Sequence, residues 1–321
     1  MQVIASAPGK AILFGEHAVV YGKPAIAMAI DRRAYVKVSK NPDKKIHVNI
    51  RDLNIRGYID FQNNAIISDS PQKGILKYIL NSLKKVHDGS GLNICIDVNI
   101  PIGGGLGSSA AVTVATIAAV SKYNNINLKE IEIAKYAHEV ELEVQKSASP
   151  LDTTISTYGG LIYLEKDAKD IIQLEIDYNI PVVIGYTETR GDTGKLVAEV
   201  RKKKELYPKI IDPVIDSIES VVEEARNSIL KNDKERIIEL MNINHGLLDA
   251  LGVNTKELSD MVYTARTAAN CGSKITGAGG GGSIIAYCPY ETEEVLSAIE
   301  EIENAININI SKEGVKITVS N

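Results

Sequence analysis

The chain has 321 residues, 44% of them apolar and 24% charged, which is enough for one large or two medium domains with hydrophobic cores and excludes general disorder. A formal net charge of −5 argues against a nucleic-acid partner, whose phosphates require a basic face. No apolar stretch reaches the roughly 18 residues of a membrane span, so we expect a soluble protein without a membrane partner.

The first part of the chain is expected to form a mixed sheet. Strands are predicted over 3–9, 34–40 and 45–52, where β-branched residues alternate or run continuously between Gly, Pro, Asn and Asp. Apolar residues at helical spacing predict an amphipathic helix over 72–86. A buried strand over 92–101, a glycine loop and a helix of small residues from 108 to about 123 follow in that order.

The later elements change in character near residue 180. A Glu-rich helix over 128–147 and a strand over 159–165 come before this point, and a strand over 180–189 comes after it. Two or three long helices are expected between 194 and 270, then a glycine loop, a helix from 291 to about 304 and a closing strand over 315–320. We therefore predict two domains, 1–180 and 181–321.

Three further features of the sequence indicate the cellular compartment of the protein and the character of its surface. The cysteines, Cys95, Cys271 and Cys288, are separated and lack any CxxC pair, so we expect a reducing cytoplasm and no disulfide framework. The first ten residues lack the charged start and apolar core of a signal peptide, so none is expected. The one basic run, residues 201–204, is expected to be a solvated helix face.

The most informative segment is PIGGGLGSSAA, residues 101–111. Its glycines free the backbone to curl, and the helix that follows offers unpaired N–H groups and its dipole to an anion. The hydroxyls of Ser108 and Ser109 can add a phosphate contact and a magnesium ligand, respectively. The plainer alternative is a flexible loop before a core helix. No GxxxxGK[ST] sequence occurs, which excludes a P-loop ATPase.

Two other segments accompany this loop. Residues 277–282 fit GxGxxG, but the strand-like SIIAYC that follows argues against a dinucleotide fold, and the run could equally be a tight hairpin. Residues 8–26, PGKAILFGEHAVVYGKPAI, bring Lys10, Glu16 and His17 close to further glycines. Singly, Lys10 would be interpreted as a surface lysine and His17 as a structural histidine, but together with two glycine loops they indicate an active site.

These three segments, in this order, resemble the motifs of the GHMP kinase family and span most of the chain. The resemblance implies an α+β fold of two domains, with a ribosomal-protein-like N-terminal domain, a ferredoxin-like C-terminal domain and the active site in the cleft between them. The first segment is most similar to the family members that phosphorylate mevalonate, because GEH is followed by AVVYG and not by a TDY-like sequence. The compact form SASPLD resembles archaeal members.

A fourth segment, ELEVQKSASPLDTTISTYGG, is similar to the family stretch that carries a magnesium-binding Glu and a catalytic Asp, here Glu141 and Asp152. Glu139 and Glu143 do not keep the family spacing. For Asp152 alone, a helix N-cap after Pro150 would be the plainer interpretation.

A fifth segment, TRGDTGKLV, aligns Thr193 with a family Thr that contacts the acceptor. Arg190 then lies one residue too early to match its family counterpart.

The resemblance implies a kinase that uses ATP and Mg²⁺ to phosphorylate (R)-mevalonate at its 5-hydroxyl in isoprenoid biosynthesis. Lys10 would stabilise the transferring group, Asp152 would accept the hydroxyl proton, and Ser109 with Glu141 would hold the metal. Glu16, His17 and Thr193 would orient the acceptor. The phosphates of ATP would be bound by Gly103, Gly104, Gly105, Leu106, Gly107, Ser108, Ser109 and Gly279.

Several alternatives stay open at this point. Within the family these are a phosphomevalonate kinase and other sugar or homoserine kinases, although no basic cluster for a phosphorylated acceptor is evident. A decarboxylase of the same superfamily and an RNA-binding module are disfavoured by the Ser-Ser loop and by the acidic charge, respectively. The residues that contact adenine, feedback inhibition by prenyl diphosphates and the oligomeric state, a homodimer included, are not determined by the sequence.

Overall fold

The structure, a computed structural model, describes residues 1–43, 45–68, 70, 74–101, 104–146, 148–187 and 192–320, so Gly103 and Arg190 lie outside the described residues. The described strands are β1 (Gln2–Phe14), β2 (Ala25–Lys40), β3 (Ile46–Ile50), β4 (Ile55–Asp60), β5 (Ala65–Ser68), β6 (Leu92–Val98), β7 (Leu161–Leu164), β8 (Ile171–Leu174), β9 (Val182–Tyr186), β10 (Gly272–Thr276), β11 (Ser283–Tyr287), β12 (Asn304–Ile308) and β13 (Lys316–Ser320). The α-helices are α1 (Gly74–Val86), α2 (Ser108–Tyr123), α3 (Glu130–Gln145), α4 (Leu151–Tyr158), α5 (Thr193–Leu206), α6 (Pro208–Leu230), α7 (Lys234–Ala250), α8 (Lys256–Ala268) and α9 (Thr292–Glu300). Short 3₁₀ turns are η1 (Ala18–Tyr21), η2 (Arg51–Leu53) and η3 (Lys166–Ala168).

The larger sheet is mixed, as predicted. Its strand order is β13-β1-β2-β6-β3-β4-β5, with β7 beside β2 and β8 beside β7. Only the β3–β6 pair is parallel among the described pairings. β1 and β2 are longer than the sequence predicts. β1 continues past Pro8 through a register shift, and β2 pairs with β7 in its first part and with β6 in its second.

Helix α2 forms the centre of the first half of the molecule. It packs on β1 and β2 and against α1, α3 and α4, and its residues from Ala110 to Ser121 are buried. A helix that is covered on every side must be apolar or small all round, which explains its run of Ala and Val. The predicted bounds of α2 are confirmed, and those of α1 and α3 agree to within two residues at each described end.

The second sheet has the order β10-β11-β9-β12 and is antiparallel throughout its described pairs. Helices α7, α8 and α9 pack on it, and α6 packs on α7. The sequence predicted two or three helices between 194 and 270, which is wrong, because four lie there. The final helix ends at Glu300 and not near residue 304, where β12 begins.

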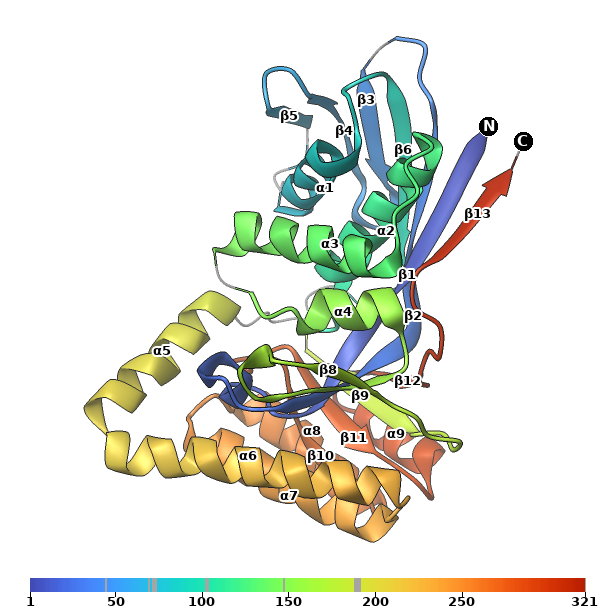
Figure 1. The fold of residues 1–321 in the computed structure, drawn as a ribbon. Helices are drawn as coiled ribbons and strands as arrows, with labels where there is room; N and C mark the ends of the chain where they lie inside the picture. The colour runs from blue at the N-terminus through green and yellow to red at the C-terminus, as the bar shows by residue number, and fades with distance from the viewer. Residues whose placement is uncertain are drawn as a thin grey trace.

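Strand β1 joins the two halves of the molecule. Its end contacts the second sheet, where the Thr276 hydroxyl donates to the carbonyl of Ile12 at 3.1 Å. After the second sheet the chain returns, and β13 pairs with β1, so that the two chain ends lie together (Figure 1). The division at residue 180 stays a prediction. Within the described residues, no helix combines the length and apolar character that a membrane crossing requires.

Candidate active site

The first glycine loop ends at the amino end of α2. Gly107, the N-cap, has φ +72° and Gly105 has φ +68°, both in the left-handed region. A Cβ on Gly107 would lie 2.7 Å from Cγ of Lys10, and the Lys10 amide donates to the carbonyl of Leu106 at 2.9 Å. The loop therefore lies directly against β1. Ser108 begins α2, whose first amides have no partner within the helix and can bind an anion.

Lys10 and Asp152 form an ion pair beside this helix end. Lys10 Nζ lies 3.2 Å from Asp152 Oδ1, and the Lys10 side chain is only 6% exposed, whereas that of Asp152 is 33% exposed. Asp152 is the second residue of α4, and Pro150 occupies the N-cap position, so the alternative of Asp152 as an N-cap is wrong. A ligand can therefore reach the Asp152 carboxylate, whereas the Lys10 ammonium is buried.

Glu141 lies on α3 and is buried, with 3% of its surface exposed. Burial, and then the negative charge of Asp152, raise the pKa of its carboxyl to about 8, while the positive charge of Lys10 opposes this shift. A buried carboxyl close to a second carboxylate, beside a phosphate-type loop, is a suitable environment for a cation.

The neighbouring glutamates of α3 point elsewhere. Lys85 on α1 pairs with Glu139 at 2.8 Å and with Glu143 at 3.0 Å. Each of them is two positions away from Glu141 in the sequence and so lies on a different face of the helix. The structure thus distinguishes Glu141 from the two residues with which it could be confused.

Tyr78 on α1 also reaches this site, and the sequence analysis missed it. Its hydroxyl accepts a hydrogen bond from Gln145 at 2.8 Å. Burial raises the pKa of Tyr78; the Ser109 side chain is also in hydrogen-bonding contact, and Glu141 and Asp152 are close enough to act on its charge. No motif marks Tyr78, because it occupies one position in an ordinary amphipathic helix.

His17 links the first segment to the third. Its Nε2 donates to the carbonyl of Ala278 at 2.9 Å, which leaves Nδ1 as the acceptor of a neutral ring. Burial lowers the pKa of His17, the bond to Ala278 and the charge of Glu16 oppose this, and Lys203 lowers it further. The His17 residue is only 5% exposed, and its backbone has φ +59°.

Glu16 is paired inside the protein with Lys274, a residue that the sequence analysis did not place at the site. The Glu16–Lys274 ion pair is nearly inaccessible, with 1% and 0% side-chain exposure, and Lys274 also donates to the carbonyl of Ile275 at 2.7 Å. Burial lowers the pKa of Lys274, and Glu16 opposes this. One carboxylate oxygen of Glu16 is buried without a hydrogen-bond partner.

The third segment is a hairpin, as one of the alternatives predicted, and its tip faces the first glycine loop. β10 and β11 pair from Gly272 to Tyr287, with the glycines between them. A Cβ on Gly105 would lie 3.8 Å from Cα of Gly277, and one on Gly104 would lie 2.7 Å from Oγ of Ser283. Gly279 has φ +77° and lies against Val253.

Among the described residues, no hydrogen bond or ion pair joins Thr193 to this cluster. It is the exposed first residue of α5, capped by Asp192, whose side chain accepts from the Lys195 amide at 3.0 Å. The preceding residues 188–191, Arg190 among them, lie outside the described part of the chain.

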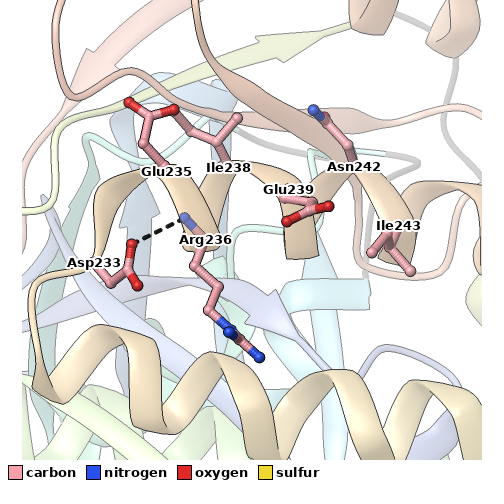
Figure 2. A pocket seen from close by; sticks show the side chains of 7 residues that line it. All are labelled: Asp233, Glu235, Arg236, Ile238, Glu239, Asn242 and Ile243. Atoms are coloured by element: carbon pink, nitrogen blue, oxygen red, sulfur yellow. Dashed lines mark hydrogen bonds between the residues drawn. The ribbon is translucent and has the colours of Figure 1, made fainter.

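A separate hollow of about 750 Å³ lies along α7. Figure 2 shows its lining side chains, which are Asp233, Glu235, Arg236, Ile238, Glu239, Asn242 and Ile243. None of the predicted site residues lines it. Its charged side chains lie along one helix and are open to solvent, so it is a surface feature and not the reaction centre.

The chain is similar to known proteins in sequence. The family model described as GHMP kinases N terminal domain matches residues 73–160, and the one described as GHMP kinases C terminal matches residues 222–311. The chain is 48% identical to a mevalonate kinase of Methanothermobacter thermautotrophicus, covering 98% of this chain and 99% of that one. It is 46% identical to a mevalonate kinase of Pyrococcus furiosus, covering 99% and 98%.

Solved structures are similar over nearly the whole chain. The Methanococcus jannaschii mevalonate kinase matches with a TM-score of 0.82 at 35% identity, covering 96% of this chain and 98% of that one. The L. major mevalonate kinase in complex with R-mevalonate matches with a TM-score of 0.82 at 26% identity, over 95% of each chain. The α+β, two-domain fold that the sequence predicts is confirmed by these matches.

Proposed function

The chain belongs to the GHMP kinase family, and from this premise we propose that it transfers the γ-phosphoryl group of ATP to the 5-hydroxyl of (R)-mevalonate. The product is 5-phosphomevalonate, an early intermediate of isoprenoid biosynthesis. The protein is an ATP-dependent phosphotransferase with an alcohol group as acceptor, like the relatives to which it is similar over their full length.

The observation that carries the proposal is the Lys10–Asp152 pair at 3.2 Å beside the amino end of α2. Phosphoryl transfer requires an anion site, a positive charge near the transferred group and a base for the acceptor hydroxyl. The loop amides of residues 104–109 supply the first, Lys10 the second and Asp152 the third. The exposure of Asp152 supports its contact with a bound acceptor, and burial of Lys10 strengthens its field.

Ser109 and Glu141 would hold magnesium, and their chemistry fits the ion. Mg²⁺ prefers oxygen ligands and takes few from the protein, since waters and phosphates complete its shell. Within the described residues no group of three or more His, Cys, Asp or Glu side chains is arranged to hold a metal. When bound, the ion neutralises charge on the phosphate oxygens. Glu141 must lose its proton for this role.

His17, Glu16 and Thr193 would orient the acceptor. A neutral His17 with Nε2 committed to Ala278 has Nδ1 available to accept from a hydroxyl. The buried Glu16–Lys274 ion pair joins the segment that contains His17 to strand β10. We place the reaction in the cytoplasm, where a reducing environment suits the three cysteines, which are all free thiols in this fold.

The test is an incubation of the purified protein with ATP and magnesium and, separately, mevalonate, phosphomevalonate, homoserine and galactose. ADP release is measured for each acceptor, and phosphorus NMR identifies the phosphorylated oxygen. Turnover with mevalonate alone, at the 5-hydroxyl, is expected. Turnover with phosphomevalonate or a sugar in place of mevalonate would refute mevalonate as the acceptor, but it would still show that the protein is an ATP-dependent kinase.

A further inference from the structure

The basic run of residues 201–204 is only in part the solvated helix face that the sequence predicts. Arg201 and Lys202 are exposed, but Lys203 and Lys204 are half-buried, so the prediction is wrong for these two. Both make contacts with neighbouring elements, Lys203 with Leu251 and Lys204 with Asp212. Helix α5 runs along the edge of the molecule toward the start of α6 (Figure 1), and only Val200 of its residues is buried.

Lys204 anchors α5. Its Nζ lies 2.5 Å from Asp212 Oδ1 on α6 and 5.8 Å from the ring centroid of Tyr21 in η1. Cation–π contacts act over about 6 Å, so this one side chain bridges α5 to both neighbours.

Lys203 Nζ is fixed at the end of α7. It donates to the carbonyl of Leu251 at 2.7 Å, and it lies over Gly252, where a Cβ would come within 2.2 Å of it. Gly252 has φ +72°, so glycine is favoured there by both the backbone and the ammonium. An ammonium has three donors, and two of them remain after the bond to Leu251.

A short chain of contacts connects this ammonium to the acceptor side of the site. Val253, which follows Gly252, accepts from the Gly280 amide at 2.8 Å, and Ala278 in the same loop accepts from His17. Lys203 is also close enough to lower the pKa of His17. Among the described residues no carboxylate forms an ion pair with Lys203, in contrast to Lys204 and Lys23, which each have one or more.

We infer that Lys203 binds the carboxylate of the acceptor. The inference rests on the proposed function, in which the acceptor carries a carboxylate at the opposite end of its carbon chain from the reacting hydroxyl. In that function the reacting hydroxyl lies at Asp152 and His17 orients the acceptor, so the carboxylate is expected on the side of His17, where Lys203 acts. A half-buried cation that is already immobilised and lacks an anion stabilises such a group at little entropic cost.

The test compares mevalonate with its carboxamide, in which the charge is removed and the shape is kept. The wild-type protein is expected to prefer the acid by roughly 10- to 100-fold in kcat/KM, the range of a hydrogen bond to a charged group. Lys203→Met should lose this preference through a higher KM for mevalonate, while its KM for ATP and its turnover of the carboxamide stay unchanged. Lys203→Arg should regain part of the preference.

Lys202→Met is the matched control, because it removes an exposed charge from the adjacent position. It should keep the preference of the wild type. The inference is overturned if Lys203→Met keeps the preference for the acid, or if its kcat/KM falls equally for mevalonate and for the carboxamide. Either result would mean that Lys203 only connects α5 to the end of α7, and the proposed kinase function would stand. Turnover of the carboxamide by Lys203→Met also reports that the variant is folded. A wild type inactive with mevalonate would overturn the proposed function, and the inference with it.

Discussion

Lys10 Nζ on β1 lies 3.2 Å from Asp152 Oδ1 in the first turn of α4, and the ammonium is buried while the carboxylate is open to a ligand. The pair joins two segments that are distant in the chain at the amino end of α2. This arrangement keeps the charge of Lys10 fixed and leaves an oxygen of Asp152 accessible for an acceptor hydroxyl.

Asp152→Asn removes the proposed base and keeps its shape. We expect kcat to fall by about 100- to 10,000-fold, the usual contribution of a positioned general base, with little change in the KM for ATP. Steady-state ADP release measures both constants. Asp97→Asn is the control, since Asp97 pairs with Arg51 and has a similar exposed fraction, 38%. A loss smaller than this range would argue against proton transfer to Asp152.

Glu141→Gln should change how stability depends on pH. The folded pKa of about 8 lies above the ordinary 4.5 of a glutamate carboxyl, so folding takes up a proton between these values, and this contribution to stability is lost as the pH rises from 4.5 through 8. The glutamine side chain does not ionise, so the stability of the variant does not fall over this pH range. Without ligands it should be more stable than the wild type above pH 8 by up to about 5 kcal/mol, at about 1.4 kcal/mol for each unit between the two pKa values, and equal to it at the acidic end.

Urea unfolding at the two ends of this pH range measures the effect. Glu143→Gln, on the same helix but paired with Lys85 at the surface, should leave the trend of the wild type in place. Magnesium with ATP should stabilise the wild type more than Glu141→Gln, because the ion requires the carboxylate. Equal stabilisation of both proteins would contradict a metal-binding role for Glu141.

Tyr78→Phe removes the hydroxyl that contacts Gln145 and Ser109. Because Ser109 is a proposed metal ligand, we expect kcat/KM for ATP with magnesium to fall by roughly 10-fold, the effect of about one buried hydrogen bond. Tyr290→Phe removes a hydroxyl that bonds to Glu235 at the surface, at 2.8 Å, and should be neutral. An unchanged magnesium dependence in Tyr78→Phe would place Tyr78 outside the functional site.

The Glu16–Lys274 pair should be strongly coupled. Removal of either partner leaves a buried charge without its counter-ion, so Glu16→Gln or Lys274→Met alone should lower the free energy of unfolding by about 3–5 kcal/mol. The double variant should lose clearly less than the sum. Denaturant unfolding of all four proteins gives this coupling energy, and additive losses would show that the two side chains act independently.

The third loop depends on its glycines. Gly279→Ala would place a Cβ 2.2 Å from the carbonyl of Val253 at φ +77°, so we expect the free energy of unfolding to fall by at least about 1–3 kcal/mol. Gly246→Ala is the matched control, since Gly246 lies in α7 with nothing within 4 Å of its added Cβ. That variant should gain about 0.5–1 kcal/mol, because alanine favours a helix. Thermal unfolding distinguishes the two.

The candidate site was predictable where residues of distinctive chemistry stand next to glycines. Lys10, Ser109, Glu141 and Asp152 were named from motifs, and the structure brings Lys10, Glu141 and Asp152 together. Tyr78 carries no such mark, since its role depends on which face of α1 meets α2 and α3. Lys203 was assigned to a solvated face for the same reason, because the run of basic residues does not indicate which of them turns inward.

The sequence by itself determined the elements with strong local signals: the helix that begins at Ser108 and the family motifs. The hairpin between β10 and β11 was one of the alternatives that the sequence left open. It missed α4, whose Thr and Ile residues favour strands and which is helical because it is buried against α2 and β1. Tertiary structure alone decided that β13 returns to β1 and that Glu16 meets Lys274. Such contacts join residues far apart in the chain, so their energies are set by packing and charge in space and leave no local pattern in the sequence.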